Sequence, residues 1–170
     1  MDADQVRTFL LSLPHVVETM QWGENLVFWV GDKAVGGKMF ALINLESDGK
    51  AAMSFCAGPE RFAELVEREG VVPAPYMARI YWVALERWSA LPSNELHSLL
   101  KAAHEMTYAK LPQRTKDVLA LPASELRRLV AERRKLLEAT SAKEKAATEN
   151  KAAVKAAKKA ADVKKKATGV

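Results

Sequence analysis

The sequence predicts an α+β fold followed by a basic tail, and three patterns in its 170 residues support this prediction. Short apolar runs with valine, isoleucine and aromatic residues are separated by glycine-containing turns, which is typical of strands. Other segments carry apolar side chains at helical spacing and begin or end at proline, serine or glycine. Residues 143–170 consist mainly of lysine and alanine. With 49% hydrophobic residues overall, the chain can bury one hydrophobic core.

The first part of the chain predicts one helix and then an antiparallel meander. Asp4 is a candidate N-cap for a short amphipathic helix that ends at Pro14. Gly36 and Gly37 allow a turn or bulge between the first two apolar runs, and residues 47–50 form a hairpin signal before the third run. The strands predicted in this way are residues 26–30, 38–43 and 51–56.

The stretch 73–83 combines two prolines with three aromatic residues, so backbone shape and burial are both strongly specified there. Pro73 and Pro75 exclude the α region for the residues before them, and residues 72–76 are therefore expected to run extended at a sheet edge. After a short turn, side chains alternate along residues 80–85, which predicts a strand.

Two interpretations of this stretch remain open. In the first, it is a stiff crossing that delivers Tyr76 and Trp82 to a core. In the second, it is a binding surface, because an arginine among aromatic side chains, here Arg79, suits contacts with nucleic-acid backbone or bases.

Three further helices are predicted. The first starts at Pro59, and the second is capped by Ser93, buries a stripe of leucines and closes before Pro112. The third follows residues 120–126 and continues through Val130, Leu136 and Leu137. The segment 90–96 recurs in similar form at 120–126, and both copies are explained as helix starts rather than as a repeat. We therefore expect an α+β domain over residues 1–118, a helical extension over residues 119–142 and a basic tail over residues 143–170.

No sequence pattern indicates catalysis, so we expect a protein that is not an enzyme and that holds no metal or cofactor. Nucleophile-elbow, zincin, P-loop and dinucleotide-binding patterns are all absent from the sequence. Cys56 lies in an apolar run and is expected to be buried and inert. His97 and His104 share one helix face with Lys101 and Tyr108, opposite the leucines, and we expect this face to be exposed to solvent.

The apolar runs are too short for a membrane span, which needs about 20 residues. The N-terminus has neither the basic start nor the apolar segment of a secretory leader. We therefore expect a cytoplasmic protein without a membrane partner and without an evident small-molecule substrate.

Charge is distributed unevenly along the chain. Residues 143–170 contain nine lysines against three acidic side chains, a net charge of +6, whereas residues 1–142 carry a net charge of -1. The composition of this tail resembles the lysine- and alanine-rich tails of linker histones and of histone-like bacterial proteins. Such a segment suits nonspecific contacts with nucleic-acid phosphates, and a solubilising extension is the alternative.

Seven short segments form an ordered pattern along the chain: Leu13-Pro14-His15-Val16, Trp22-Gly23, Val27-Phe28-Trp29-Val30-Gly31, Gly37-Lys38-Met39-Phe40-Ala41, Pro73-Ala74-Pro75-Tyr76-Met77, Trp82-Val83 and Ala109-Lys110-Leu111-Pro112. Taken in this order, they resemble the MmcQ/YjbR family of small bacterial proteins over about residues 3–118. The resemblance implies a CyaY-like α+β fold, with an antiparallel sheet flanked by helices, and a double-wing arrangement for which DNA binding has been proposed. It implies no catalytic or metal-binding residues. The chain departs from the family at Ala103-His104, where Ser-Tyr is common, and the basic tail lies outside the family pattern.

The sequence thus favours a DNA-binding protein that reads no particular base sequence. The alternatives are a protein-interaction module that uses the aromatic stretch 73–82 and, with less support, frataxin-like iron handling. In the tail, the predicted phosphate contacts are Lys151, Lys155, Lys158, Lys159, Lys164, Lys165 and Lys166. In the domain, the predicted contacts are Arg79, Lys110, Arg114 and Lys116, with Lys33 and Lys38 as further basic candidates and Trp22 and Trp29 as candidate stacking groups.

Overall fold

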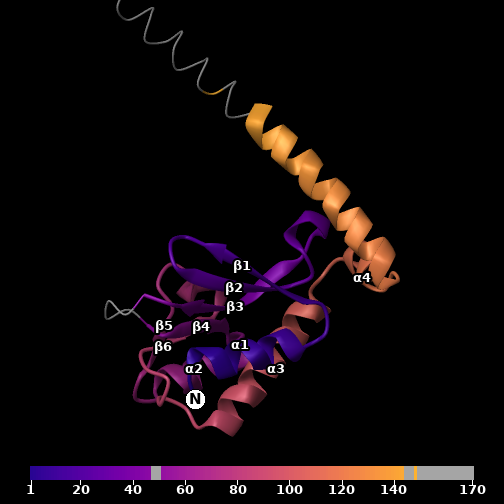
Figure 1. Ribbon diagram of the computed structural model, residues 1–170. Helices are drawn as coiled ribbons and strands as arrows, with labels where there is room; N and C mark the ends of the chain where they lie inside the picture. The colour runs from indigo at the N-terminus through magenta and orange to yellow at the C-terminus, as the bar shows by residue number, and fades with distance from the viewer. Residues whose placement is uncertain (47–50, 144–147, 149–170) are drawn as a thin grey trace, which may run out of the picture. The chain divides into compact units, whose positions relative to one another are not determined.

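The computed structural model describes residues 1–46, 51–143 and 148 of the chain (Figure 1). The chain divides into two compact units, residues 1–126 and residues 127–170. The sheet and its covering helices belong to the first unit, whereas the second contains most of a helix that runs over residues 123–143. The domain boundaries expected at residues 118 and 142 stay predictions.

A six-stranded antiparallel sheet forms the centre of the first unit, in the order β1-β2-β3-β4-β6-β5 (Figure 1). The predicted α+β class and the predicted meander are confirmed, because β2, β3 and β4 are consecutive neighbours in the sheet. The sixth strand along the chain then inserts between β4 and β5. The strands are β1 (Val16–Gln21), β2 (Asn25–Val30), β3 (Lys38–Asn44), β4 (Met53–Cys56), β5 (Val71–Pro73) and β6 (Trp82–Leu85).

The helices of the first unit pack mainly against one face of this sheet. Two of them, α1 and α3, lie beside each other on that face, and α2 packs against β5 and β6 (Figure 1). Their apolar stripes and the inward side chains of the strands form one core, in which Phe28, Phe40 and Phe55 are fully buried. The helices are α1 (Ala3–Ser12), α2 (Pro59–Val66), α3 (Ser93–Ala109) and α4 (Gln113–Leu119), and the 3-10 helices are η1 (Lys33–Val35) and η2 (Ala78–Ile80).

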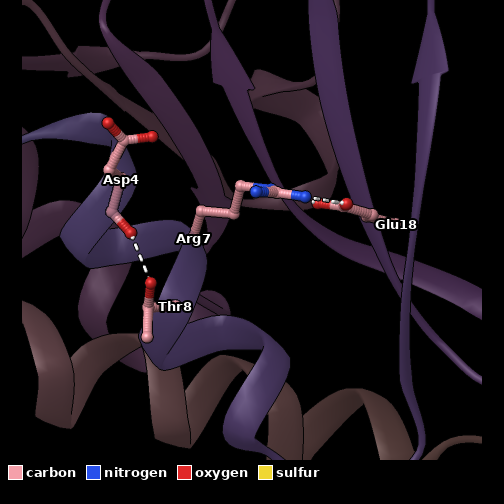
Figure 2. A network of polar contacts seen from close by, with 4 residues as sticks. All are labelled: Asp4, Arg7, Thr8 and Glu18. Carbon is pink, nitrogen blue, oxygen red and sulfur yellow. Dashed lines mark hydrogen bonds and ion pairs between the residues drawn. The ribbon is translucent and has the colours of Figure 1, made fainter.

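Two sets of polar interactions stabilise the N-terminal helix α1, one at its first turn and one between Arg7 and strand β1. Asp2, rather than the predicted Asp4, is the N-cap, because its side chain accepts a hydrogen bond from the Gln5 amide in a capping box. Arg7 ties the helix to β1, since its Nε donates to Oε2 of Glu18 at 2.7 Å (Figure 2). This hydrogen bond, together with the charge of Arg7, lowers the pKa of Glu18.

Strand β1 was not predicted from the sequence. Its residues mix polar and apolar side chains, and all of them are at least partly exposed, because β1 is an edge strand that pairs only with β2. An edge strand of this kind lacks the continuous apolar run by which β2 and β3 were recognised. The sequence of β1 therefore lacks a clear strand pattern because β1 lies at the edge of the sheet.

The stretch 73–83 matches its predicted backbone in part. Pro73 ends β5 at the edge of the sheet, as expected for a residue that cannot donate a backbone hydrogen bond. The following strand starts at Trp82, two residues later than predicted, because Tyr81 has φ +62° and closes the turn of η2 in a left-handed conformation. Within β6, Val83 faces the main core, whereas Trp82 joins a smaller apolar cluster of its own.

Candidate nucleic-acid interface

The glycine-rich loop between β2 and β3 packs closely against α4. A Cβ atom placed on Gly31 would lie 3.1 Å from Cδ2 of Leu119, and one placed on Gly36 would lie 2.8 Å from Oγ1 of Thr115. Both glycines have positive φ, which other residues adopt only with strain. Inside the loop, Oδ1 of Asp32 accepts a hydrogen bond from the Ala34 amide at 2.8 Å. The loop and α4 therefore form one packed junction, which we call the loop–α4 junction (residues 31–38 and 113–119).

Four of the predicted basic contacts lie on this junction. Lys33 lies in the loop, Lys38 is the first residue of β3, and Arg114 belongs to α4; all three are exposed. Lys116 is half-buried, because its Nζ donates to the Ala109 carbonyl at 2.9 Å and lies 5.5 Å from the centre of the Tyr108 ring. The fold thus gathers basic residues that are far apart in the sequence, a feature suited to phosphate contacts.

The remaining two predicted contacts of the domain lie elsewhere. Arg79 is exposed in η2, next to Ile80 and Tyr81, which are also exposed. Lys110 is the C-cap of α3. Burial raises the pKa of the Cys56 thiol, and the positive charge of Lys110 opposes that rise.

The two tryptophans named as stacking groups differ in accessibility. Trp22 is 65% exposed at the turn between β1 and β2 and can present its ring to a ligand. Trp29 is only 9% exposed, and its Nε1 donates to Oγ1 of Thr19 at 2.9 Å. Trp29 is therefore too buried to serve as the candidate stacking group, because its ring is covered and its Nε1 is bound to β1.

The aromatic side chains of the stretch 73–83 also differ in how far they are exposed to solvent. Trp82 is 3% exposed and lies in the smaller apolar cluster, as the structural interpretation predicted. Tyr76 is fully exposed, so its predicted delivery to a core was wrong. Directly after Pro75, Tyr76 adopts the left-handed φ of +63°. Tyr81 is 45% exposed and contacts Phe62 edge-on.

The histidines of α3 also differ from the expected solvent-exposed face. His104 is buried: its Nε2 donates to the Pro14 carbonyl at 2.8 Å, and Phe40 contacts the ring edge-on. His97 packs against Phe9, with ring centres 4.2 Å apart. The expectation failed because α3 is covered by α1 and its following loop as well as by the sheet, which widens the buried face of the helix.

The residues that the structure describes offer little that resembles a catalytic or metal site. Within the described residues, no three histidine, cysteine, aspartate or glutamate side chains are grouped so that they could hold a metal ion. Cys56 is half-buried, and the raised pKa of its thiol disfavours the reactive thiolate. A hollow of about 330 Å³ lies between α2 and α3, lined by acidic, basic and leucine side chains. No helix in the described part of the chain has the length and apolar character to cross a membrane.

The predicted contacts in the tail, from Lys151 to Lys166, lie outside the described residues.

The loop–α4 junction could be predicted from the sequence only in part. Its basic residues were named individually, but Thr115, which joins the two segments, was not. The glycine pattern from Gly31 to Gly37 predicted a turn and carried no signal for the helix that packs on it.

Comparison with known proteins places the chain in a family. The YjbR family model matches residues 11–106, which is more than half of the chain. The chain belongs to the YjbR family. Its structure is similar to the crystal structure of a Deinococcus radiodurans protein with a DUF419 domain, with a TM-score of 0.61 and 27% sequence identity. The similarity covers 71% of this chain and 89% of that one. None of the curated proteins matches this YjbR-family chain.

Proposed function

We propose that this YjbR-family protein binds DNA, largely without sequence preference. The observation that carries the proposal is the separation of charge along the chain: residues 143–170 have a net charge of +6, whereas residues 1–142 have a net charge of -1. Lysine contributes a mobile point charge rather than a rigid fork, so this segment suits phosphate contacts that do not discriminate between bases.

The loop–α4 junction supports a second, smaller contact from the folded unit. Lys33, Lys38 and Arg114 are exposed there, and Lys116 lies on the same helix as Arg114. Because Gly31 and Gly36 allow the loop to pack closely against α4, these charges lie on a tightly packed part of the fold. In the proposed complex, the lysine-rich segment supplies most of the affinity and the junction orients the folded unit on the duplex.

Salt titrations separate the two contributions. The observed affinity for duplex DNA should fall with salt at a slope of about -0.9 per phosphate neutralised. A chain ending at residue 142 should bind more weakly and with a flatter slope. The full chain with Lys33→Gln and Arg114→Gln should lose about one unit of slope per lost contact. The matched control is Arg61→Gln with Lys101→Gln, which removes the same charge from exposed positions on α2 and α3.

Two results would contradict the proposal. If truncation leaves the salt slope unchanged, the lysine-rich segment does not contact phosphates. If the junction variant and its matched control lose equal affinity, the effect comes from net charge alone, and the junction has no specific role.

A second candidate function is a protein-interaction surface on the turn between β5 and β6. Tyr76 is fully exposed, and Ile80 and Tyr81 are 56% and 45% exposed, which is a large apolar area on one short turn. Substitution of Tyr76 by serine would then reduce partner binding without changing DNA affinity. Frataxin-like iron handling has no such observation in its favour among the described side chains.

A further inference from the structure

The helix over residues 123–143 carries an apolar face that is exposed toward its C-terminal end. Its large apolar residues recur at helical spacing and fall within an arc of about 120°. Two of them, Leu136 and Leu137, are 68% and 53% exposed. Adjacent exposed leucines on a helix are costly to leave in water, and they indicate a surface that is covered by a partner. The five residues of this apolar face are Leu126, Leu129, Val130, Leu136 and Leu137.

The charge of the helix indicates the chemistry of that partner. Residues 127–143 contain six basic and two acidic side chains, a net charge of +4. One of the two acidic groups, Glu132, already lies 3.9 Å from Arg128. The positive charge continues into the lysine-rich sequence that follows. A partner that covers the leucines must therefore offer negative charge next to an apolar interior.

A second copy of the helix fits these features poorly. Arg133 lies within the apolar face, one turn after Leu129 and one turn before Leu137, so a helix dimer would bury an arginine against another positively charged helix. DNA would satisfy the charge but would leave the leucines in water. A lipid surface meets both requirements, because an arginine on the apolar face extends its head group to the lipid phosphates while the leucines enter the acyl boundary.

We propose that the apolar face of this helix docks on an anionic lipid surface, with Leu136 and Leu137 inserted and Arg133 on lipid phosphates. The helix lies in the interface and does not span the bilayer. This proposal is independent of DNA binding, and it revises the expectation of no membrane partner, which rested on the lack of a spanning segment. Basic amphipathic helices with leucine on one face are typical of such attachment.

The test compares charge-neutral substitutions on opposite faces of the helix in the full chain. Leu136→Gln with Leu137→Gln removes the inserted side chains but keeps every charge, and glutamine has nearly the helix propensity of leucine. The matched control, Ala131→Gln with Ala139→Gln, places glutamine on the opposite face. Each protein is sedimented with vesicles of equal parts phosphatidylglycerol and phosphatidylcholine, and with vesicles of phosphatidylcholine alone. Circular dichroism checks that helix content is equal.

The full chain and the Ala131→Gln/Ala139→Gln control should both bind the vesicles that contain phosphatidylglycerol. The partition coefficient of the Leu136→Gln/Leu137→Gln variant should be lower by about tenfold or more. DNA affinity should be the same in all three proteins. No binding of the full chain to these vesicles would overturn the proposal. So would equal binding of the leucine pair, because the lysine-rich segment would then account for attachment. A dimer in sedimentation equilibrium that the leucine pair abolishes would assign the face to a second copy instead.

Discussion

Substitution of Gly36 by alanine tests whether the loop–α4 junction is as tightly packed as the structure indicates. Gly36 has φ +89°, and an added Cβ would lie 2.8 Å from Oγ1 of Thr115, whose side chain is 1% exposed. Two penalties are therefore expected. A left-handed alanine costs about 1–2 kcal/mol of backbone strain, and overpacking against Thr115 costs about 1–3 kcal/mol more.

Gly23 provides the matched control for this substitution. It has nearly the same conformation, with φ +85°, but a Cβ placed there would lie 3.4 Å from Oε1 of Glu46, which is ordinary contact. Gly23→Ala should therefore carry the backbone penalty without the overpacking. Both variants gain the same small benefit from a less flexible unfolded chain, about 0.4–1 kcal/mol. The difference between them isolates the contact with Thr115.

Urea unfolding of the full chain, followed by tryptophan fluorescence, measures both variants. We expect Gly36→Ala to lower the free energy of unfolding by about 1–3 kcal/mol more than Gly23→Ala does. Addition of Thr115→Ala should restore part of that loss, since it removes the clashing hydroxyl. Equal losses in the two glycine variants, or no coupling between Gly36 and Thr115, would refute the packing of α4 on the loop. The junction would then lack the close packing that the proposed DNA contact requires.

Two further predictions concern ionisable groups of the folded unit. Because the pKa of Glu18 is lowered by Arg7, its stabilisation is full above the pKa of the unfolded carboxyl and is lost as the pH falls through the folded pKa. Glu18→Gln should therefore be less stable than the parent at neutral pH and equally stable in strong acid; a gap that persists in acid would contradict this. Since burial raises the pKa of Cys56, a disulfide reagent at neutral pH should modify it on the order of tenfold more slowly than a free thiol. Unfolding in urea should remove that difference, and a fast reaction in the native protein would contradict the burial.

Local patterns in the sequence predicted the strands of the sheet more successfully than they predicted whether single side chains are buried or exposed. The strands β2, β3 and β4 were recognised because a period of two and the turns between them are properties of neighbouring residues. His104 and Trp29 were misjudged because each shares the periodicity of an exposed position. Their burial involves other elements of the fold: His104 contacts the carbonyl of Pro14, 90 residues away, and Trp29 contacts Thr19 on the neighbouring strand β1.

Within the candidate interface, the sequence named the basic residues but could not group them. Lys33 and Arg114 are separated by most of the folded unit, and no local rule indicates that their segments pack together. The separation of charge between residues 1–142 and 143–170, in contrast, requires no fold at all. The lysine-rich segment was therefore the part of the proposal that sequence alone could support.

By itself, the sequence determined the α+β class, the extended edge at Pro73 and the basic tail, because proline geometry, side-chain alternation and charge act over a few neighbouring residues. Only the tertiary structure decided that β6 inserts between β4 and β5, that Tyr76 turns outward and that Gly36 meets Thr115. Each of these depends on which distant segments bury surface against one another. That choice is made by the packing of the whole core and is not encoded in any single stretch.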